Sequence, residues 1–262
     1  MNKTLIALAI LAAAGITQAA IAVDSVGFSY AQSFDSLTTS TSATPWLNDG
    51  TLAGWSLFTS TLADAPTLLG GNGGSNTGSF YSFGAAGSTE RALGATASGG
   101  NYFGSPASGA VAGYISVAFS NATGITLDGT VVAFNGEQWR NGGNTAVQQL
   151  SFEFGFGSAF GTVAAWIPAP TGNMVSPLVG STAAAVDGNA AGRIGGLGAT
   201  IDGWAPGQTL FLRWVDRNDV GNDHGLAIDD FSLTVTVVPE PSLLAMMLAG
   251  LGFVGLMARR RA

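Results

Sequence analysis

The chain has 262 residues, of which 47% are apolar and only 10% are charged. This composition is too apolar for a disordered chain, and 39 glycines without a three-residue period exclude collagen. The sequence contains no cysteine, which excludes disulfides, thiolate catalysis and cysteine-based metal sites.

The N-terminus has the order of a secretory signal peptide. Lys3 supplies a basic start, an apolar stretch follows, and small residues stand at Ala20 and Ala22. We expect signal peptidase to cleave after Ala22, which removes residues 1–22 and leaves Val23 at the start of the mature chain.

The middle of the chain, residues 23–238, has a hydrophobic period of two, which is typical of β-strands. Alternation is clearest in residues 115–119, 150–156 and 227–237, whereas residues 131–134 and 210–215 are apolar on both faces, as in central strands. Glycine-rich and asparagine-rich turns separate these segments, and we find no stretch with a helical period. The pattern predicts one all-β domain, an antiparallel β-sandwich of jelly-roll type.

The charge of this middle region is strongly acidic. Residues 23–238 hold 15 acidic residues, five arginines and no lysine, which leaves a net charge of −10. A domain of this charge without a basic patch should not bind nucleic acid.

Candidates for catalysis are few. The only histidine is His224, in a predicted solvated turn, and the sequence lacks the G-x-S-x-G elbow of serine hydrolases. A glycosidase needs two facing carboxylates, and Glu90, Glu137 and Glu153 are the glutamates available. Glu90 and Glu137 lie near arginines and Glu153 alternates with phenylalanines, so each has a structural interpretation. We therefore expect no enzymatic activity.

Aromatic residues in loops are the candidates for sugar binding, because indole rings stack on pyranose faces. Three tryptophans lie beside prolines or glycines in predicted loops: Trp46, Trp166 and Trp204. Trp214 alternates with leucines and is assigned to the core. Filling of the core is the alternative interpretation for all of them.

Arg213 falls in a predicted central strand. A buried, unpaired charge costs several kcal/mol, so this arginine requires a carboxylate partner. We expect Glu137 or Asp230 to supply it, because one follows an apolar strand and the other starts the last strand.

An acidic loop precedes the final strand. Calcium prefers oxygen ligands, and the candidate ligands here are Asp216, Asn218, Asp219, Asp223 and Asp229. Their spacing is not that of an EF-hand. Asp229 is predicted to share a face with Phe231 and Leu233, so its carboxylate needs a cation or donors. Calcium is the one cofactor that the sequence suggests, and an ion pair with Arg193 or Arg217 is the alternative.

The C-terminus carries a second export signal. Pro239, Glu240 and Pro241 precede an uncharged stretch, residues 242–258, and the basic cluster Arg259, Arg260 and Arg261 follows. A helix of this stretch would be about 25 Å long, the short limit for crossing a bilayer, with the arginines on the cytoplasmic side. A plain tail anchor is one interpretation.

In tripeptide, apolar helix and arginine cluster, residues 239–262 resemble the PEP-CTERM sorting signal of Gram-negative bacteria. The resemblance implies an inner-membrane-anchored precursor, recognition by an exosortase, cleavage near the tripeptide, and release or attachment at the cell surface.

The core also resembles an exported β-sandwich domain that recurs with such tails. The matching segments are GW at 54–55, YSFG at 81–84, RALG at 91–94, GEQWR at 136–140, RWVD at 213–216 and DHGLAIDD at 223–230. The last segment more loosely resembles the final strand of lectin-like jelly rolls. We expect an exported cell-surface or extracellular-matrix protein with a structural or interaction role. A carbohydrate-binding module that takes extracellular polysaccharide is the second hypothesis, and a glycan-active enzyme is the third.

Overall fold

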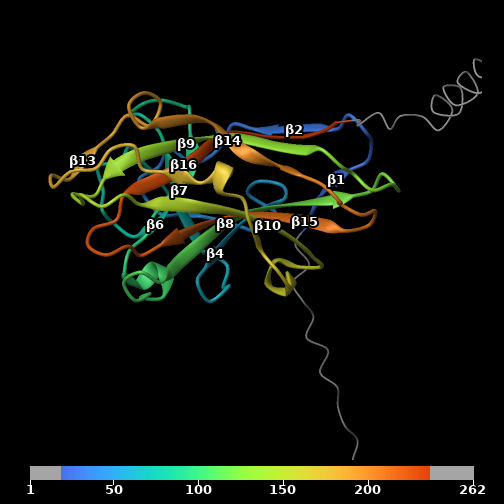
Figure 1. Ribbon diagram of the computed structural model, residues 1–262. Helices are drawn as coiled ribbons and strands as arrows, with labels where there is room; N and C mark the ends of the chain where they lie inside the picture. The colour runs from blue at the N-terminus through green and yellow to red at the C-terminus, as the bar shows by residue number, and fades with distance from the viewer. Residues whose placement is uncertain (1–18, 237–262) are drawn as a thin grey trace, which may run out of the picture.

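The computed structural model describes residues 19–236, which form two β-sheets packed face to face (Figure 1). The predicted transmembrane helix, residues 242–258, and the C-terminal signal lie outside the described residues, as does nearly all of the predicted signal peptide. The predicted all-β sandwich is confirmed.

The first sheet has seven strands. Its hydrogen-bonded order is β1 (Ile21–Val23), β8 (Val111–Asn121), β15 (Thr209–Arg217), β10 (Gln149–Gly157) and β11 (Ile167–Pro168), with β4 (Trp55–Thr59) also paired to β8 and β12 (Met174–Val175) also paired to β10. In Figure 1, β4, β8, β10 and β15 form the lower layer.

The second sheet has nine strands. Its order is β13 (Ala184–Ala185), β9 (Thr130–Asn141), β16 (Gly225–Val235), β7 (Ala92–Thr96), β6 (Ser79–Phe83), β5 (Thr67–Gly71) and β3 (Thr44–Pro45), with β14 (Arg193–Ile201) also paired to β9 and β2 (Ser29–Gln32) also paired to β16. Within the described residues the helices are single 3-10 turns: η1 (Asn101–Phe103), η2 (Phe160–Thr162) and η3 (Pro170–Gly172).

The core lies between the sheets and is rich in aromatic rings. Trp55 and Trp214 stack with their centroids 5.8 Å apart, and Phe231 meets both rings edge-on. All three side chains are buried, as predicted for Trp214. Alternate residues of each strand reach this space because successive side chains point to opposite faces of a sheet.

A bulge in β16 corrects one expectation from the sequence. The pairing of β16 with β9 shifts register between Asp229 and Ser232, and Asp230 adopts a left-handed φ of 48°. Phe231 and Leu233 therefore face the core together with Ile228, while Asp229 points to the outer face. The prediction that Asp229 shares a face with Phe231 was wrong, because the inserted residue reverses the alternation.

The N-terminal strand begins upstream of the predicted cleavage point. β1 pairs in parallel with β8, with Ile21 opposite Phe119 and Ala22 opposite Ser120. Val23 is fully buried. Cleavage after Ala22 stays a prediction, and it would remove two of the three residues of β1.

Candidate functional site

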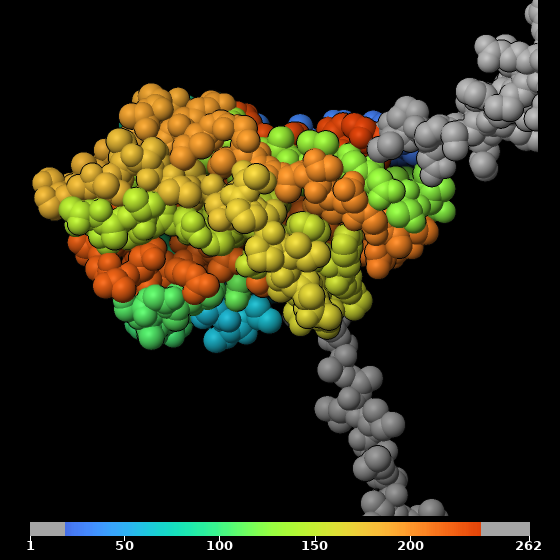
Figure 2. Space-filling model, viewed as in Figure 1, coloured from blue at the N-terminus to red at the C-terminus, as the bar shows by residue number. Residues whose placement is uncertain are grey.

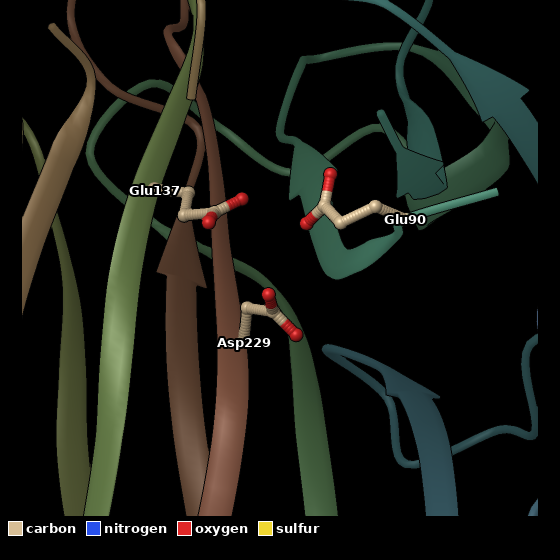
Figure 3. Close-up of side chains that lie close together, drawn as sticks. All are labelled: Glu90, Glu137 and Asp229. Carbon is tan, nitrogen blue, oxygen red and sulfur yellow. The ribbon is translucent and has the colours of Figure 1, made fainter. Parts of the chain in front are cut away.

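Three carboxylic side chains from separate parts of the chain meet on the outer face of the nine-stranded sheet. Glu90 lies in the loop before β7, Glu137 on β9 and Asp229 on β16, and their carboxyl groups face one another (Figure 3). One oxygen from each lies within 4.8 Å of the others. We call these three residues the acidic triad.

The strand pairing explains how two members of the acidic triad meet. β9 and β16 are neighbours, with Glu137 opposite Ala227 and Asp229 opposite Asn135. The two acids are therefore diagonal neighbours, a separation that long side chains can bridge.

The chain between β12 and β14 covers the triad's side of the sheet. Gly188 packs so closely on the Trp139 ring that an added Cβ would lie 2.3 Å from it. Figure 2 shows this stretch, coloured gold to orange, on the surface above β9. Glu137 is completely buried and Asp229 is 4% exposed, whereas Glu90 is half-buried at the rim.

Each glutamate of the triad is fixed by one donor and keeps one free oxygen. The Trp139 indole N–H donates to Glu137 Oε2 at 2.9 Å, and the Asn189 amide donates to Glu90 Oε2. Glu137 Oε1, Glu90 Oε1 and Asp229 Oδ1 are buried without a hydrogen-bond partner among the described residues.

Burial raises the pKa of two members of the triad, Glu137 and Asp229. Desolvation raises the pKa of Glu137 to about 7, although the Trp139 bond opposes the shift. Desolvation likewise raises the pKa of Asp229 to about 8, with Glu137 and Asp230 adding repulsion. The arginine that acts on Glu137, Arg193, is itself 3.2 Å from Asp230.

Such a site can hold protons or a hard cation, but it is poorly placed for acid–base catalysis. A catalytic carboxylate must reach substrate, and Glu137 has no exposed surface. The nearby surface cavity of about 440 Å³ is lined by residues such as Thr39, Asn72 and Arg91, and its described lining does not include the triad.

Arg213 has a different partner from the predicted ones. It forms an ion pair with Glu153, directly opposite on β10, and lies on the outer face of the seven-stranded sheet. The prediction of Glu137 or Asp230 was wrong, because Arg213 and those acids belong to different sheets. Asp230 instead forms an ion pair with Arg193. The sequence had suggested Arg193 as a partner of the neighbouring Asp229.

The three candidate tryptophans differ in how far they are exposed. Trp46 is 5% exposed and Trp204 is fully buried, so neither presents a ring face to a sugar. Trp166 remains half-buried, beside Phe160 and over the Arg213 guanidinium. Sequence reasoning could not separate them, because a neighbouring proline or glycine does not report whether a loop folds back onto the core.

The acidic loop does not converge with Asp229. Burial, with repulsion from Asp219, raises the pKa of Asp223 to about 7. Burial also raises the pKa of Asp216, with repulsion from Asp223 and Asp219. Asn218 donates its amide to the Pro106 carbonyl. Among the described residues, the acidic triad is the group whose three carboxylates come within 4.8 Å. Calcium in the loop stays a prediction, but Asp229 belongs to another site.

His224 is not a solvated turn residue. It is 2% exposed, and its Nδ1 accepts the Gly142 backbone N–H at 2.9 Å. Burial lowers the pKa of this imidazole. A neutral, buried ring of this kind is part of the packing.

Sequence reasoning missed the acidic triad as a unit. Asp229 follows the core residue Ile228, and Glu137 lies in a segment predicted to continue an apolar strand, so a carboxylate in a strand was the available signal. Glu90 gives no signal, since only the loop's path brings it to the other two.

The described residues form a β-sandwich with an acidic site on an outer face. Residues 237–261 match the PEP-CTERM protein-sorting motif. The motif implies an exported protein of the kind that an exosortase sorts. A comparison with curated proteins gives no match. Within residues 19–236, no helix has the length and apolar character needed to cross a membrane.

Proposed function

We propose that this chain is a non-enzymatic β-sandwich module that acts at the cell surface or in the extracellular matrix, in a structural or interaction role. The supporting observation is that, apart from the half-buried Glu90, its candidate catalytic groups are buried or held in an ion pair. Glu137 and His224 are buried, and Glu153 is held by Arg213. A sorting signal that delivers the protein to the cell surface fits a resident of that location.

The test asks whether the protein binds matrix polysaccharide without cleaving it. The full chain, purified in detergent, is incubated with extracellular polysaccharide of its host, and both co-sedimentation and new reducing ends are measured. We expect no new reducing ends. Release of reducing ends by the parent chain, abolished by Glu137→Gln, would establish a glycan-active enzyme instead.

Carbohydrate binding is the second candidate function, and one feature favours it. Four aromatic rings gather on the outer face of the seven-stranded sheet, and we call them the aromatic patch: Phe58, Tyr114, Phe160 and Trp166. The Phe160 centroid lies 4.5 Å from Phe58, 5.5 Å from Tyr114 and 5.2 Å from Trp166. Phe160 is itself buried, but the other three rings are half-buried and can stack on sugar rings.

A glycan array with matched variants separates the two candidates. Trp166→Ala should abolish glycan binding if the aromatic patch is the site. The control is Ile125→Ala, which removes an exposed apolar side chain outside the patch. No bound glycan, or equal binding by both variants, would dismiss the patch as a sugar site.

A further inference from the structure

We propose that Glu90, Glu137 and Asp229 bind a hard divalent cation, with Ca²⁺ as the first candidate. This site would lie on the outer face of the nine-stranded sheet, and it is independent of the function proposed above. Ca²⁺ is coordinated by oxygen atoms, and carboxylates are its preferred protein ligands.

Buried carboxylate oxygens without hydrogen-bond partners favour a cation at this site. Glu137 and Asp229 are at least 96% buried, and each has an oxygen without a hydrogen-bond donor. A buried carboxylate oxygen that gives up water without gaining a partner costs several kcal/mol. Figure 3 shows the three carboxyl groups directed toward a common space.

The hydrogen-bond donors of the two glutamates also favour a cation, because they hold the carboxyl groups in place without neutralising them. Trp139 and Asn189 are neutral donors, each bonded to one oxygen of a glutamate. This is the arrangement expected of groups that orient metal ligands from behind.

The basic side chains around the triad leave its negative charge largely uncompensated. Arg193 is engaged with Asp230, and Arg91 donates to the Ser88 carbonyl at 2.6 Å. Each arginine thus has another partner, while Arg91 also attracts Glu90 and its Nε has no hydrogen-bond partner among the described residues. Three carboxylates remain for one space, and a divalent cation would offset most of their charge.

The dimensions fit one ion. Ligands on opposite sides of Ca²⁺ lie about 4.6–5.2 Å apart, because each Ca²⁺–oxygen distance is about 2.3–2.6 Å. The triad's oxygens lie within 4.8 Å of one another. Glu90 is half-buried, so an ion can enter at this side.

Thermal melting of the full chain in detergent tests the site. With three protein ligands, the affinity should resemble that of extracellular calcium modules, about 0.1–1 mM. At 10 mM Ca²⁺ the melting temperature should then rise by roughly 3–10 °C relative to EDTA at matched ionic strength. Asp229→Asn should abolish this rise while melting in EDTA no lower than the parent, because the amide has the same shape and carries no buried carboxylate charge.

Three further variants keep the test decisive if Asp229→Asn fails to fold. Glu90→Gln alters the half-buried member and should also abolish the rise. Asp24→Asn changes an exposed acid and should retain it. Asp219→Asn changes the acidic loop and should likewise retain it.

Terbium provides a direct readout, because Tb³⁺ takes calcium sites and is sensitised by a nearby indole. Trp139 donates a hydrogen bond to Glu137, so excitation of its indole should sensitise the emission of Tb³⁺ bound in the triad. Trp139→Phe should reduce that emission several-fold.

Two results would overturn the proposal. One is a melting temperature that is the same in EDTA and in millimolar Ca²⁺, Mg²⁺ and Mn²⁺, which would mean that the carboxyls share protons. The other is a calcium effect that survives Glu90→Gln but disappears in Asp219→Asn, which would place the ion in the acidic loop.

Discussion

Replacing Arg213 by alanine should destabilise the sandwich through the outer face of the seven-stranded sheet. Arg213 Nε and Nη2 both donate to Glu153 Oε2, at 2.8 and 2.5 Å. The two side chains are only 15% and 21% exposed. The guanidinium also lies 3.9 Å from the Trp166 ring centroid and 5.0 Å from that of Tyr114.

The magnitude follows from this burial. Exposed pairs contribute at most about 1 kcal/mol, whereas breaking a buried pair costs about 3–5 kcal/mol. A pair that is about four-fifths buried should lie between these limits, near 2 kcal/mol, and the cation–π contact adds about 0.5–1 kcal/mol. The free energy of unfolding should thus fall by about 3 kcal/mol, or roughly 6–12 °C in melting temperature.

Urea unfolding of a double-mutant cycle measures the effect. The cycle contains Arg213→Ala, Glu153→Ala and the double variant, and the coupling energy should be about 1–3 kcal/mol. Arg217→Ala is the control, because this exposed arginine is on the same strand and should cost less than about 1 kcal/mol. An Arg213→Ala variant within 0.5 kcal/mol of the parent, or additive single effects, would mean that the Arg213–Glu153 pair does not stabilise the sheet.

Burial lowers the pKa of His224, so the stability that its neutral ring contributes is present above the unfolded pKa of about 6.5 and is lost at lower pH. The advantage of the parent over His224→Gln in urea should therefore shrink as the pH falls from 7 to 5, and a constant difference would contradict this. Gly94→Val should cost several kcal/mol, because a Cβ there would lie 2.2 Å from the Leu226 carbonyl oxygen; a soluble variant with the parent's melting temperature would disprove it. In a host with an exosortase, mass spectrometry of the exported protein should find no residue up to Ala22 and no peptide ending in the arginine cluster. An extracellular peptide containing Arg261 would contradict the sorting prediction.

The strands that alternate simply were predictable from the sequence. In residues 150–156 every second side chain is large and apolar. β10 forms there because an extended chain places every second side chain on the same face, where these apolar side chains can be buried together. The same holds for β8 and for the core position of Trp214.

The sequence could not predict which side chains of β16 face the core on either side of its bulge. Residues 227, 229, 231 and 233 would share one face in a regular strand, but the bulge at Asp229 and Asp230 sends Asp229 outward. The left-handed φ of Asp230 is set by pairing with β9, which lies some 90 residues away in the chain. A local pattern carries no information about such a partner.

The sequence by itself determined the export signal, the strand-rich fold and the absence of cysteine chemistry, because each depends on local order or composition. The tertiary structure was needed to show that Arg213 pairs with Glu153, that Trp46 and Trp204 are buried, and that Glu90 lies beside Glu137 and Asp229. These contacts depend on strand order and on the path of a loop, which bring together residues that are distant in the chain.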